Sequence, residues 1–267
     1  MISRFERTAN YAILIVFAAL VLVPLVNVVA TALGGPASDR TGIHLENFAQ
    51  AWQQARFSTY MANSVTVTLT VLAISLIVST LAGYALGTMT FRGSTVIFYL
   101  FLLGIMVPGE AIVIPLFFDM RALGMTDTLW AVAMPQVAQS IAFGTYWMRT
   151  YFRASNRSIA EAARIDGAGP LRALWSVELP IARPALVTLI VLLFMWTWNE
   201  FLIPLVMSPT GKMRTAPLGL AFFQGQHTVD DTLMAAAAVM VALPVVGVYL
   251  FAQRHFIKGM LEGTVYE

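Results

Sequence analysis

Long apolar segments dominate the chain, and each is about as long as a helix that crosses a lipid bilayer. Six such segments can be drawn, at residues 9–33, 61–89, 95–118, 129–148, 185–207 and 233–256. About 20 apolar residues in a helix cover the roughly 30 Å hydrocarbon core of a bilayer. Membrane-spanning strands would alternate apolar and polar residues over about ten positions, and these segments do not. The pattern predicts an all-α bundle of six transmembrane helices, forming one domain over residues 1–267.

Charged residues are scarce, which supports a bilayer as the surroundings of these helices. Hydrophobic residues make up 58% of the 267 positions and charged residues 11%, against roughly 45–50% and about 25% in a soluble domain. The net charge of +2 gives no reason to expect nucleic acid as a partner, and the absence of cysteine excludes disulfides and thiolate chemistry. The first apolar run exceeds the about 7–15 residues of a secretory signal, so it is predicted to remain as the first span.

Lysine and arginine predict the orientation of the bundle, because cytoplasmic loops of membrane proteins carry an excess of both. With the N-terminus inside, the inner segments hold eleven of the 16 Lys and Arg residues, and the outer segments hold five. Both termini are therefore expected in the cytoplasm. The longest inner connection joins the fourth and fifth spans.

Proline interrupts several of the apolar segments. Pro108 and Pro115 predict a kink in the third span, because proline removes a helix hydrogen bond. Similar bends are expected at Pro135, Pro204 and Pro244. The second span is rich in glycine, serine and threonine, which let helices approach closely in lipid. Breaks at membrane depth need protein or a water-filled cavity around them, so this pattern favours a transporter over a passive anchor.

The segment 158–180 predicts two short helices on the inner side. Ser158 with Glu161 three residues later forms a capping box, at which a helix starts. Gly167 suits the turn because glycine tolerates positive φ, and Pro170 suits the first turn of the next helix. Apolar residues recur there at helical spacing: Leu171, Leu174 and Trp175. Such a pair of helices can dock in a groove on a soluble partner or lie on lipid headgroups.

The spacing within this segment resembles the EAA motif of the permease subunits of binding-protein-dependent ABC importers. That motif reads Glu-Ala-Ala, three residues, Gly, nine residues, Ile, any residue and Leu-Pro. The matching positions are Glu161-Ala162-Ala163, Gly167, Val177 and Leu179-Pro180, with Val177 the single departure. Residues 163–168, 198–205 and 256–263 are similar to the carbohydrate branch of that family, and within it to the maltose-type inner-membrane permeases. The resemblance covers nearly the whole chain after Met61.

The resemblance implies that this segment couples the chain to an ATPase, because the EAA helices of that family seat in a cleft on the ATPase subunit. The coupling residues that it implies are Glu161, Ala162, Ala163, Arg164, Asp166 and Gly167. The implied partners are a second homologous permease, two ATPase subunits and an extracytoplasmic sugar-binding protein. The implied location is the bacterial inner membrane.

Polar and ionisable residues inside the predicted spans are candidates for a substrate path, since such groups are costly in lipid. They are Glu110, Gln136, Gln139, Trp196, Asn199 and Glu200. Amide and carboxylate groups beside aromatic rings suit a carbohydrate, which offers hydroxyl groups and C–H faces. The alternative is structural: Glu200 pairs with a neighbouring helix, and the tryptophans are packing or interfacial residues.

The sequence contains no motif for nucleotide, metal or covalent chemistry. The only Gly-Lys pair, Gly211-Lys212, lacks the glycine spacing of a phosphate-binding loop. The three histidines are not spaced as metal ligands, and no serine lies in a Gly-x-Ser-x-Gly elbow. A non-catalytic subunit is therefore expected, with no cofactor of its own and with ATP and Mg²⁺ bound by the ATPase partners.

These observations predict a sugar importer permease, with the outer loop 208–232 as a surface on which the binding protein docks. Two alternatives remain open. One is the same architecture importing a polyol, a sugar phosphate or a peptide. The other is a stand-alone channel or membrane enzyme, which would act without an ATPase partner.

Overall fold

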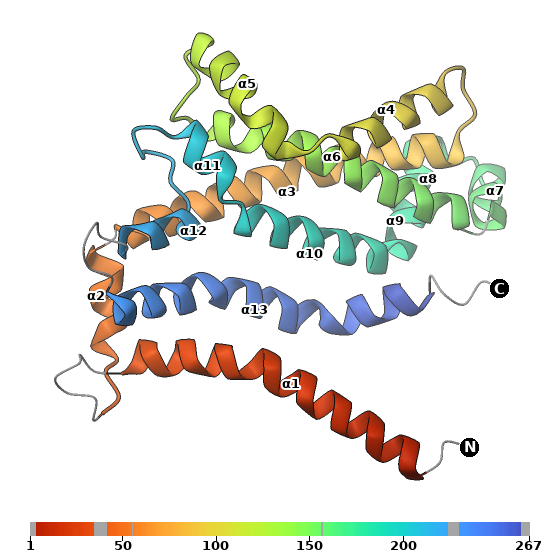
Figure 1. The fold of residues 1–267 in the computed structure, drawn as a ribbon. Coiled ribbons are helices and arrows are strands. Elements are labelled where there is room, and N and C mark those ends of the chain that lie inside the picture. Colours follow the sequence, from red (N-terminus) through yellow and green to blue (C-terminus); the bar gives the residue numbers. More distant parts are fainter. Residues whose placement is uncertain (1–3, 35–41, 55, 156, 224–229, 263–267) are drawn as a thin grey trace. The chain divides into compact units, whose positions relative to one another are not determined.

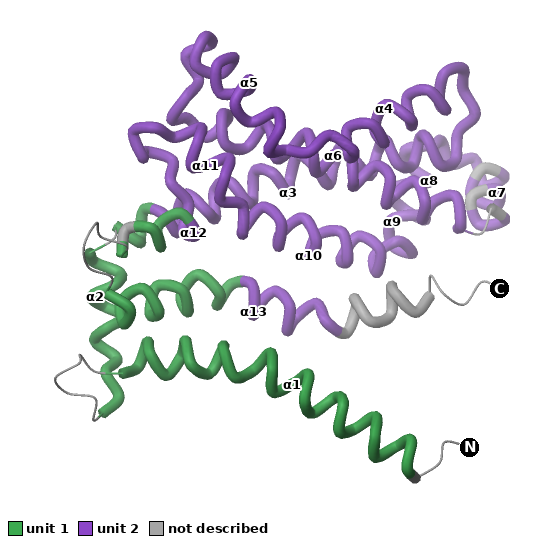
Figure 2. Tube along the Cα trace, in the orientation of Figure 1, with its two compact units in different colours: residues 1–59, 218–244 green, residues 60–217, 245–267 purple. Residues whose placement is uncertain are grey.

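A computed structural model describes the chain except for residues 1–3, 35–41, 55, 156, 224–229 and 263–267. Every regular element in the described part is a helix (Figure 1), which confirms the predicted all-α class. The chain divides into two compact units (Figure 2), one of residues 1–59 and 218–244 and the other of residues 60–217 and 245–267.

The first unit contains a long helix whose apolar surface is not covered by the chain. Helix α1 (Arg4–Leu33) has a segment hydrophobic enough to span a membrane, and none of that segment is buried. Helix α2 (Glu46–Gln54) follows, and the Asn47 side-chain amide donates to the carbonyls of Ala32 at 3.0 Å and Gly34 at 2.9 Å. This unit also holds η2 (Leu220–Phe223) and the start of α13 (Asp231–Glu262). An apolar helix with so little cover is suited to lipid.

The second unit is built around one central helix, α6 (Leu129–Ala154), eleven of whose residues are buried. Helices α4, α10 and α11 pack against it. The long helices and half-helices of this unit are α3 (Phe57–Thr88), α4 (Ser94–Met106), α5 (Gly109–Ala122), α10 (Arg183–Asn199) and α11 (Leu202–Met207). A short α12 (Ala216–Gly219) lies across the boundary between the units.

Helices α3 and α6 approach each other through small residues, as the second span predicts. A Cβ added at Gly83 would lie 2.5 Å from the Cβ of Met148, and one added at Gly144 would lie 2.6 Å from the hydroxyl oxygen of Ser79. Ser79 and Met148 are fully buried. Glycine therefore sets the distance between these two helices, as small residues do in membrane bundles.

Three helices are long and apolar enough to cross a membrane in the described part of the chain: Phe5–Leu33, Phe57–Thr88 and Asp231–Gln253. Two bent helix pairs bring the number to five if each pair is one span. Helix α6 matches the predicted fourth span in position, but it is too polar to be counted on composition. Three of its polar residues are nevertheless buried: Gln136, Ser140 and Thr145.

Within the predicted spans, the helices break at two sites beside proline. The third predicted span is two helices, α4 and α5, which meet at Val107–Pro108 with a bend of 95°. This confirms the expected kink at Pro108. Between α10 and α11 the break lies at Glu200 and Phe201, ahead of Pro204. At Pro135 and Pro244, by contrast, α6 and α13 continue without interruption.

Candidate functional site

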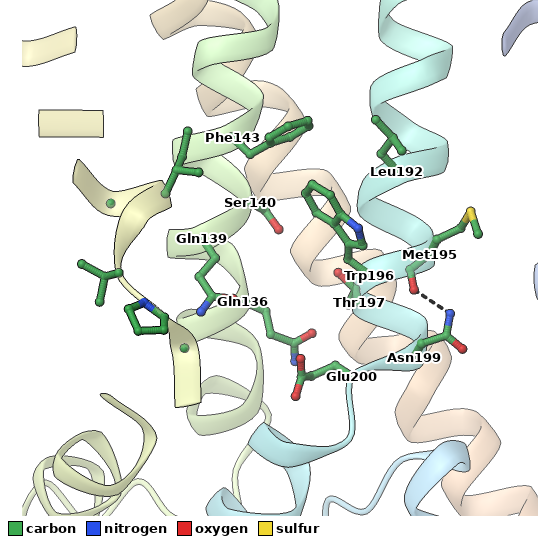
Figure 3. A pocket seen from close by; sticks show the side chains of 15 residues that line it. Gln136, Gln139, Ser140, Phe143, Leu192, Met195, Trp196, Thr197, Asn199 and Glu200 are labelled. Atoms are coloured by element: carbon green, nitrogen blue, oxygen red, sulfur yellow. Dashed lines mark hydrogen bonds between the residues drawn. The ribbon is translucent and has the colours of Figure 1, made fainter. Parts of the chain in front are cut away.

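A pocket of about 680 Å³ lies between the α4–α5 break, helix α6 and the C-terminal end of α10 (Figure 3). The region of the break contributes Gly104, Ile105, Val107, Pro108 and Gly109, while α6 and α10 contribute the functional side chains. Those side chains are Gln136, Gln139, Ser140, Phe143, Leu192, Met195, Trp196, Thr197, Asn199 and Glu200. The volume lies within the range of about 300–1,000 Å³ that is usual for small-molecule sites.

Five of the six residues predicted for a substrate path line this pocket: Gln136, Gln139, Trp196, Asn199 and Glu200. The sixth, Glu110, does not line it. Glu110 lies exposed in the first turn of α5, one residue beyond the lining Gly109. The structure thus brings together residues that the sequence places on two separate spans, while their role in transport stays a prediction.

The polar side chains of the pocket are partly engaged with their own helices. The Gln136 amide nitrogen donates to the Val132 carbonyl at 2.8 Å, while the Gln136 amide oxygen is buried without a partner. The Asn199 amide donates to the Met195 carbonyl at 2.7 Å, as Figure 3 shows. These bonds fix both side chains, and the buried Gln136 oxygen keeps an unused acceptor capacity.

Glu200 has a structural role at the break between α10 and α11. Its carboxylate accepts the backbone N–H of Ile203 at 3.0 Å and so caps the first turn of α11. The structural alternative for Glu200 was a pairing with a neighbouring helix, and this bond joins Glu200 to the start of α11. A carboxylate is well placed there, because the first N–H groups of a helix have no partner within it.

Aromatic rings form one wall of the pocket. Phe143 and Trp196 meet edge to face, with their centroids 4.7 Å apart, and the Trp196 indole projects from α10 toward α6 (Figure 3). The sequence analysis missed Phe143, Ser140 and Thr197. A signal existed for two of them, because positions 136, 140 and 143 share one face of a helix. Thr197, buried beside Trp196, has no such signal.

The segment 158–180 forms the predicted helix–turn–helix. Helix α7 (Arg157–Ile165) ends at a turn in which Gly167 has a φ of +79° and the Ala168 N–H bonds the Ala163 carbonyl at 2.9 Å. This is the usual helix end with a left-handed glycine. Gly169 then caps α8 (Pro170–Ala173), whose first residue is the predicted proline.

The second helix of the segment ends just after Pro180, at Ile181. A π-helical turn η1 (Leu174–Glu178) and a last turn α9 (Leu179–Ile181) follow α8, so Pro180 lies inside helical structure. The chain bends by 80° between Ile181 and Arg183, where α10 begins. Pro184 starts the new helix instead of ending the old one, because proline is favoured in a first helical turn.

Within this segment Leu174 is buried against the bundle, whereas Ile165, Leu171 and Trp175 are exposed. Leu174 is fully buried in a cluster with Tyr84, Met148, Phe152 and Leu189. The predicted apolar face is only partly buried, because Leu171 and Trp175 are 64% and 62% exposed and Ile165 at the turn is 86% exposed. The segment therefore presents large apolar side chains on its exposed side.

The predicted coupling residues lie on the same segment. Glu161, Ala162, Asp166 and Gly167 are exposed, and Ala163 is buried beneath them. Arg164 lies in α7, but its side chain is outside the described part of the structure. The backbone geometry thus presents the motif on the outside of the helix–turn–helix.

A second cavity of about 440 Å³ lies next to this segment. Glu161 and Glu178 reach it from the segment, and Arg149 and Arg153 reach it from the end of α6. Burial raises the pKa of Glu178 above its ordinary value, and a hydrogen bond from Ser155 opposes the rise. Arg149 donates to the Leu86 carbonyl at 3.2 Å. Side chains of the helix–turn–helix and of the end of α6 thus share the lining of this cavity.

The loop after α11 is held by a side chain that the sequence analysis did not single out. Asp127, between α5 and α6, accepts the Ser208 hydroxyl at 2.9 Å and both the N–H and hydroxyl of Thr210, at 3.1 and 2.7 Å. Asn63 donates to the carbonyls of Lys212 and Arg214. The first part of the predicted outer loop 208–232 is thus a built structure, while residues 224–229 lie outside the described part.

Apolar helices that suit lipid, half-helices that break beside a polar pocket, and an exposed helix–turn–helix together define a membrane permease. The chain belongs to the family described as the binding-protein-dependent transport system inner membrane component, which matches residues 79–261. It is therefore an integral protein of the inner membrane. Among the described side chains, no three His, Asp or Glu residues lie together as metal ligands would.

The relatives are permeases of sugar uptake systems. The chain is 30% identical over 264 residues to the diacetylchitobiose uptake system permease protein NgcG of Streptomyces coelicolor, covering 96% of this chain and 87% of that protein. It is 29% identical to the trehalose transport system permease protein SugB of Mycobacterium tuberculosis, covering 84% of this chain and 82% of SugB.

The fold is similar to a chain in the crystal structure of a bacterial ABC transporter involved in the import of the acidic polysaccharide alginate. The TM-score is 0.81 and the identity 26%, over 96% of this chain and 99% of that one. These comparisons confirm the predicted resemblance to sugar ABC importer permeases.

Proposed function

We propose that this chain is a transmembrane permease subunit of an ATP-driven importer for a mono- or oligosaccharide. It spans the bacterial inner membrane six times with both termini in the cytoplasm. It works with a second homologous permease, two ATPase subunits and an extracytoplasmic sugar-binding protein. ATP and Mg²⁺ are bound by the ATPase subunits, so this chain carries out no catalysis.

The pocket of α4, α6 and α10 is the observation that carries the sugar assignment. It combines the unpartnered amide oxygen of Gln136 with the Phe143 and Trp196 rings. A buried acceptor without a partner costs about 1–3 kcal/mol, and an entering hydroxyl group would supply the missing donor. Aromatic rings meanwhile contact the C–H faces of a sugar. The names of NgcG and SugB support the same substrate class.

The helix–turn–helix is the coupling element of the proposal. Three exposed apolar side chains, Ile165, Leu171 and Trp175, provide a surface for a groove on an ATPase subunit. Leu174 fixes the other side of the element in the bundle core, and the cavity of Glu161 and Glu178 adds a polar connection. Movement of the docked element therefore reaches α6 and α3 through packed side chains.

The family also admits a different cargo, such as a polyol, a sugar phosphate or a peptide. The pocket favours the saccharide, because its lining offers amides, hydroxyl groups and rings but no cation for a phosphate group. A stand-alone channel or membrane enzyme would not need the exposed helix–turn–helix.

Co-purification and transport test the proposal together. The affinity-tagged chain should purify with an ATP-hydrolysing subunit, and the reconstituted complex should take up saccharide only with ATP and the binding protein. The Gln136→Leu variant should bind saccharide about tenfold more weakly, which corresponds to one lost hydrogen bond of about 1.4 kcal/mol. Uptake without any ATPase subunit would overturn the importer assignment. Unchanged binding in Gln136→Leu would overturn the pocket.

A further inference from the structure

The saccharide pocket has a negatively charged lining residue, whereas an acidic sugar would need a positively charged one. Glu200 is the only ionisable side chain in the lining, and no lysine, arginine or histidine contributes to it. An anion that enters this pocket meets negative charge with no cation to offset it, which is unfavourable in a partly water-excluded site.

We infer that this pocket selects uncharged saccharides over acidic ones, with Glu200 as the residue that rejects a carboxylate. The inference rests on the proposed saccharide function of the same pocket. It separates this chain from the structurally similar transporter that imports alginate, an acidic polysaccharide.

Glu200 is positioned for this role by its structural bond. One carboxylate oxygen accepts the Ile203 N–H at 3.0 Å, which holds the side chain at the break between α10 and α11. The residue lies at the end of the same helix that presents Trp196 to the pocket (Figure 3). A carboxylate fixed in this way cannot turn away from an anionic ligand without uncapping α11.

The neutral hydrogen-bonding groups of the pocket complete the selection. Gln136 offers a buried acceptor, and Gln139 and Ser140 offer groups that can donate or accept. Such groups satisfy hydroxyl groups but cannot neutralise a carboxylate. A site for acidic sugars would instead be expected to contain arginine, whose fork binds carboxylates in pairs of hydrogen bonds.

The test compares a neutral disaccharide with the same disaccharide oxidised to a uronic acid at one C6 position. Equilibrium dialysis of the purified, assembled transporter without its binding protein measures both affinities, so that the binding protein does not select the ligand. We expect the unmodified transporter to bind the neutral sugar about tenfold more tightly or better, from one unit charge at contact range in a site of intermediate dielectric.

Two variants isolate the charge of Glu200. Glu200→Gln keeps an oxygen that accepts the Ile203 N–H and removes the charge, so the two affinities should come within about threefold. Asp119→Asn removes an equal charge from the exposed surface of α5, away from the lining, and should leave the tenfold gap. In the unmodified transporter the gap should also narrow as salt rises from about 0.01 to 1 M.

Equal binding of both sugars by the unmodified transporter would overturn the selection while leaving the saccharide function intact. A gap unchanged in Glu200→Gln would overturn the role of Glu200. Binding of neither sugar would overturn both the inference and the proposed pocket. Failure of the proposed function is thereby distinguished from failure of the charge selection.

Discussion

The close contact of α3 with α6 at Gly83 leads to a prediction whose size follows from interatomic distances. Replacing Gly83 by alanine would place a Cβ 2.5 Å from the Cβ of Met148, 2.9 Å from the Arg149 nitrogen and 3.0 Å from the Met148 carbonyl carbon. Non-bonded carbon atoms pack at about 3.5–4.0 Å. Two of the three neighbours are backbone atoms of α6, and Met148 is fully buried. The new methyl group therefore cannot be accommodated by turning one side chain.

The two helices must separate locally by about 1 Å, which is the difference between the clash and a normal contact. Overpacking of a dense interior costs about 1–3 kcal/mol. Alanine favours the helix over glycine by about 0.8–1.0 kcal/mol, which offsets part of that cost. The expected net loss is up to about 2 kcal/mol, together with weaker contact of α3 with the helix that lines the pocket.

Thermal unfolding of the purified transporter in detergent measures this loss. Gly247→Ala is the matched control, because Gly247 also lies inside a helix but an added Cβ there meets nothing within 4 Å. Gly83→Ala should unfold several degrees lower than the unmodified protein, and Gly247→Ala should be unchanged or slightly more stable. Equal stability of the two variants would show that α3 and α6 do not approach as closely as the structure has them.

Three further changes test other parts of the chain. Gly167→Pro should abolish sugar-stimulated ATPase activity with membrane insertion intact, because proline cannot adopt a φ of +79°, whereas Gly169→Ala, at a φ of −67°, should retain it. Retained coupling in Gly167→Pro would contradict the docking role. Burial raises the pKa of Glu178 above the ordinary 4.5, so just above that pH the folded chain still holds a proton that the unfolded chain has lost. Stability should therefore fall as the pH rises through the range between the unfolded and folded pKa values. Glu178→Gln should remove the share of the fall in unfolding temperature that this proton causes. Asp127→Ala should lower the unfolding temperature through about 1–3 kcal/mol of lost hydrogen bonds to the Ser208 loop, and Asp127→Asn should lose less, since asparagine keeps an acceptor and tolerates a φ of +60°.

Local patterns in the sequence predicted the local structure well. The glycine and proline positions of the segment 158–180 fixed the turn at Gly167 and the start of α8 at Pro170, because few other residues suit these backbone angles. Pro108 predicted the break of the third span for the same reason. The π-helical turn at Leu174–Glu178 was not predicted, because the burial of Leu174 and Glu178 that accompanies it depends on tertiary packing.

The candidate site was predicted in its chemistry but not in its full composition. Gln136 and Glu200 were predicted to line a substrate path because polar groups in a membrane span are costly. Phe143 and Ser140 did not, since aromatic and hydroxyl residues are common in membrane helices and only the packing of α6 against α10 brings them to the pocket. The cap that Glu200 provides for α11 also depends on a helix break that Pro204 alone did not locate.

The polarity of α6 has a consequence for how the protein enters the membrane. Gln136, Ser140 and Thr145 are buried among neighbouring helices in the finished fold, yet a solitary α6 would expose them to lipid. Its low hydropathy gives the insertion machinery little reason to release it alone into the bilayer. We therefore expect α6 to be retained beside α3 and α4 during synthesis and to enter lipid as part of a preassembled group, so a truncation that removes α3 should leave α6 on the water side of the membrane.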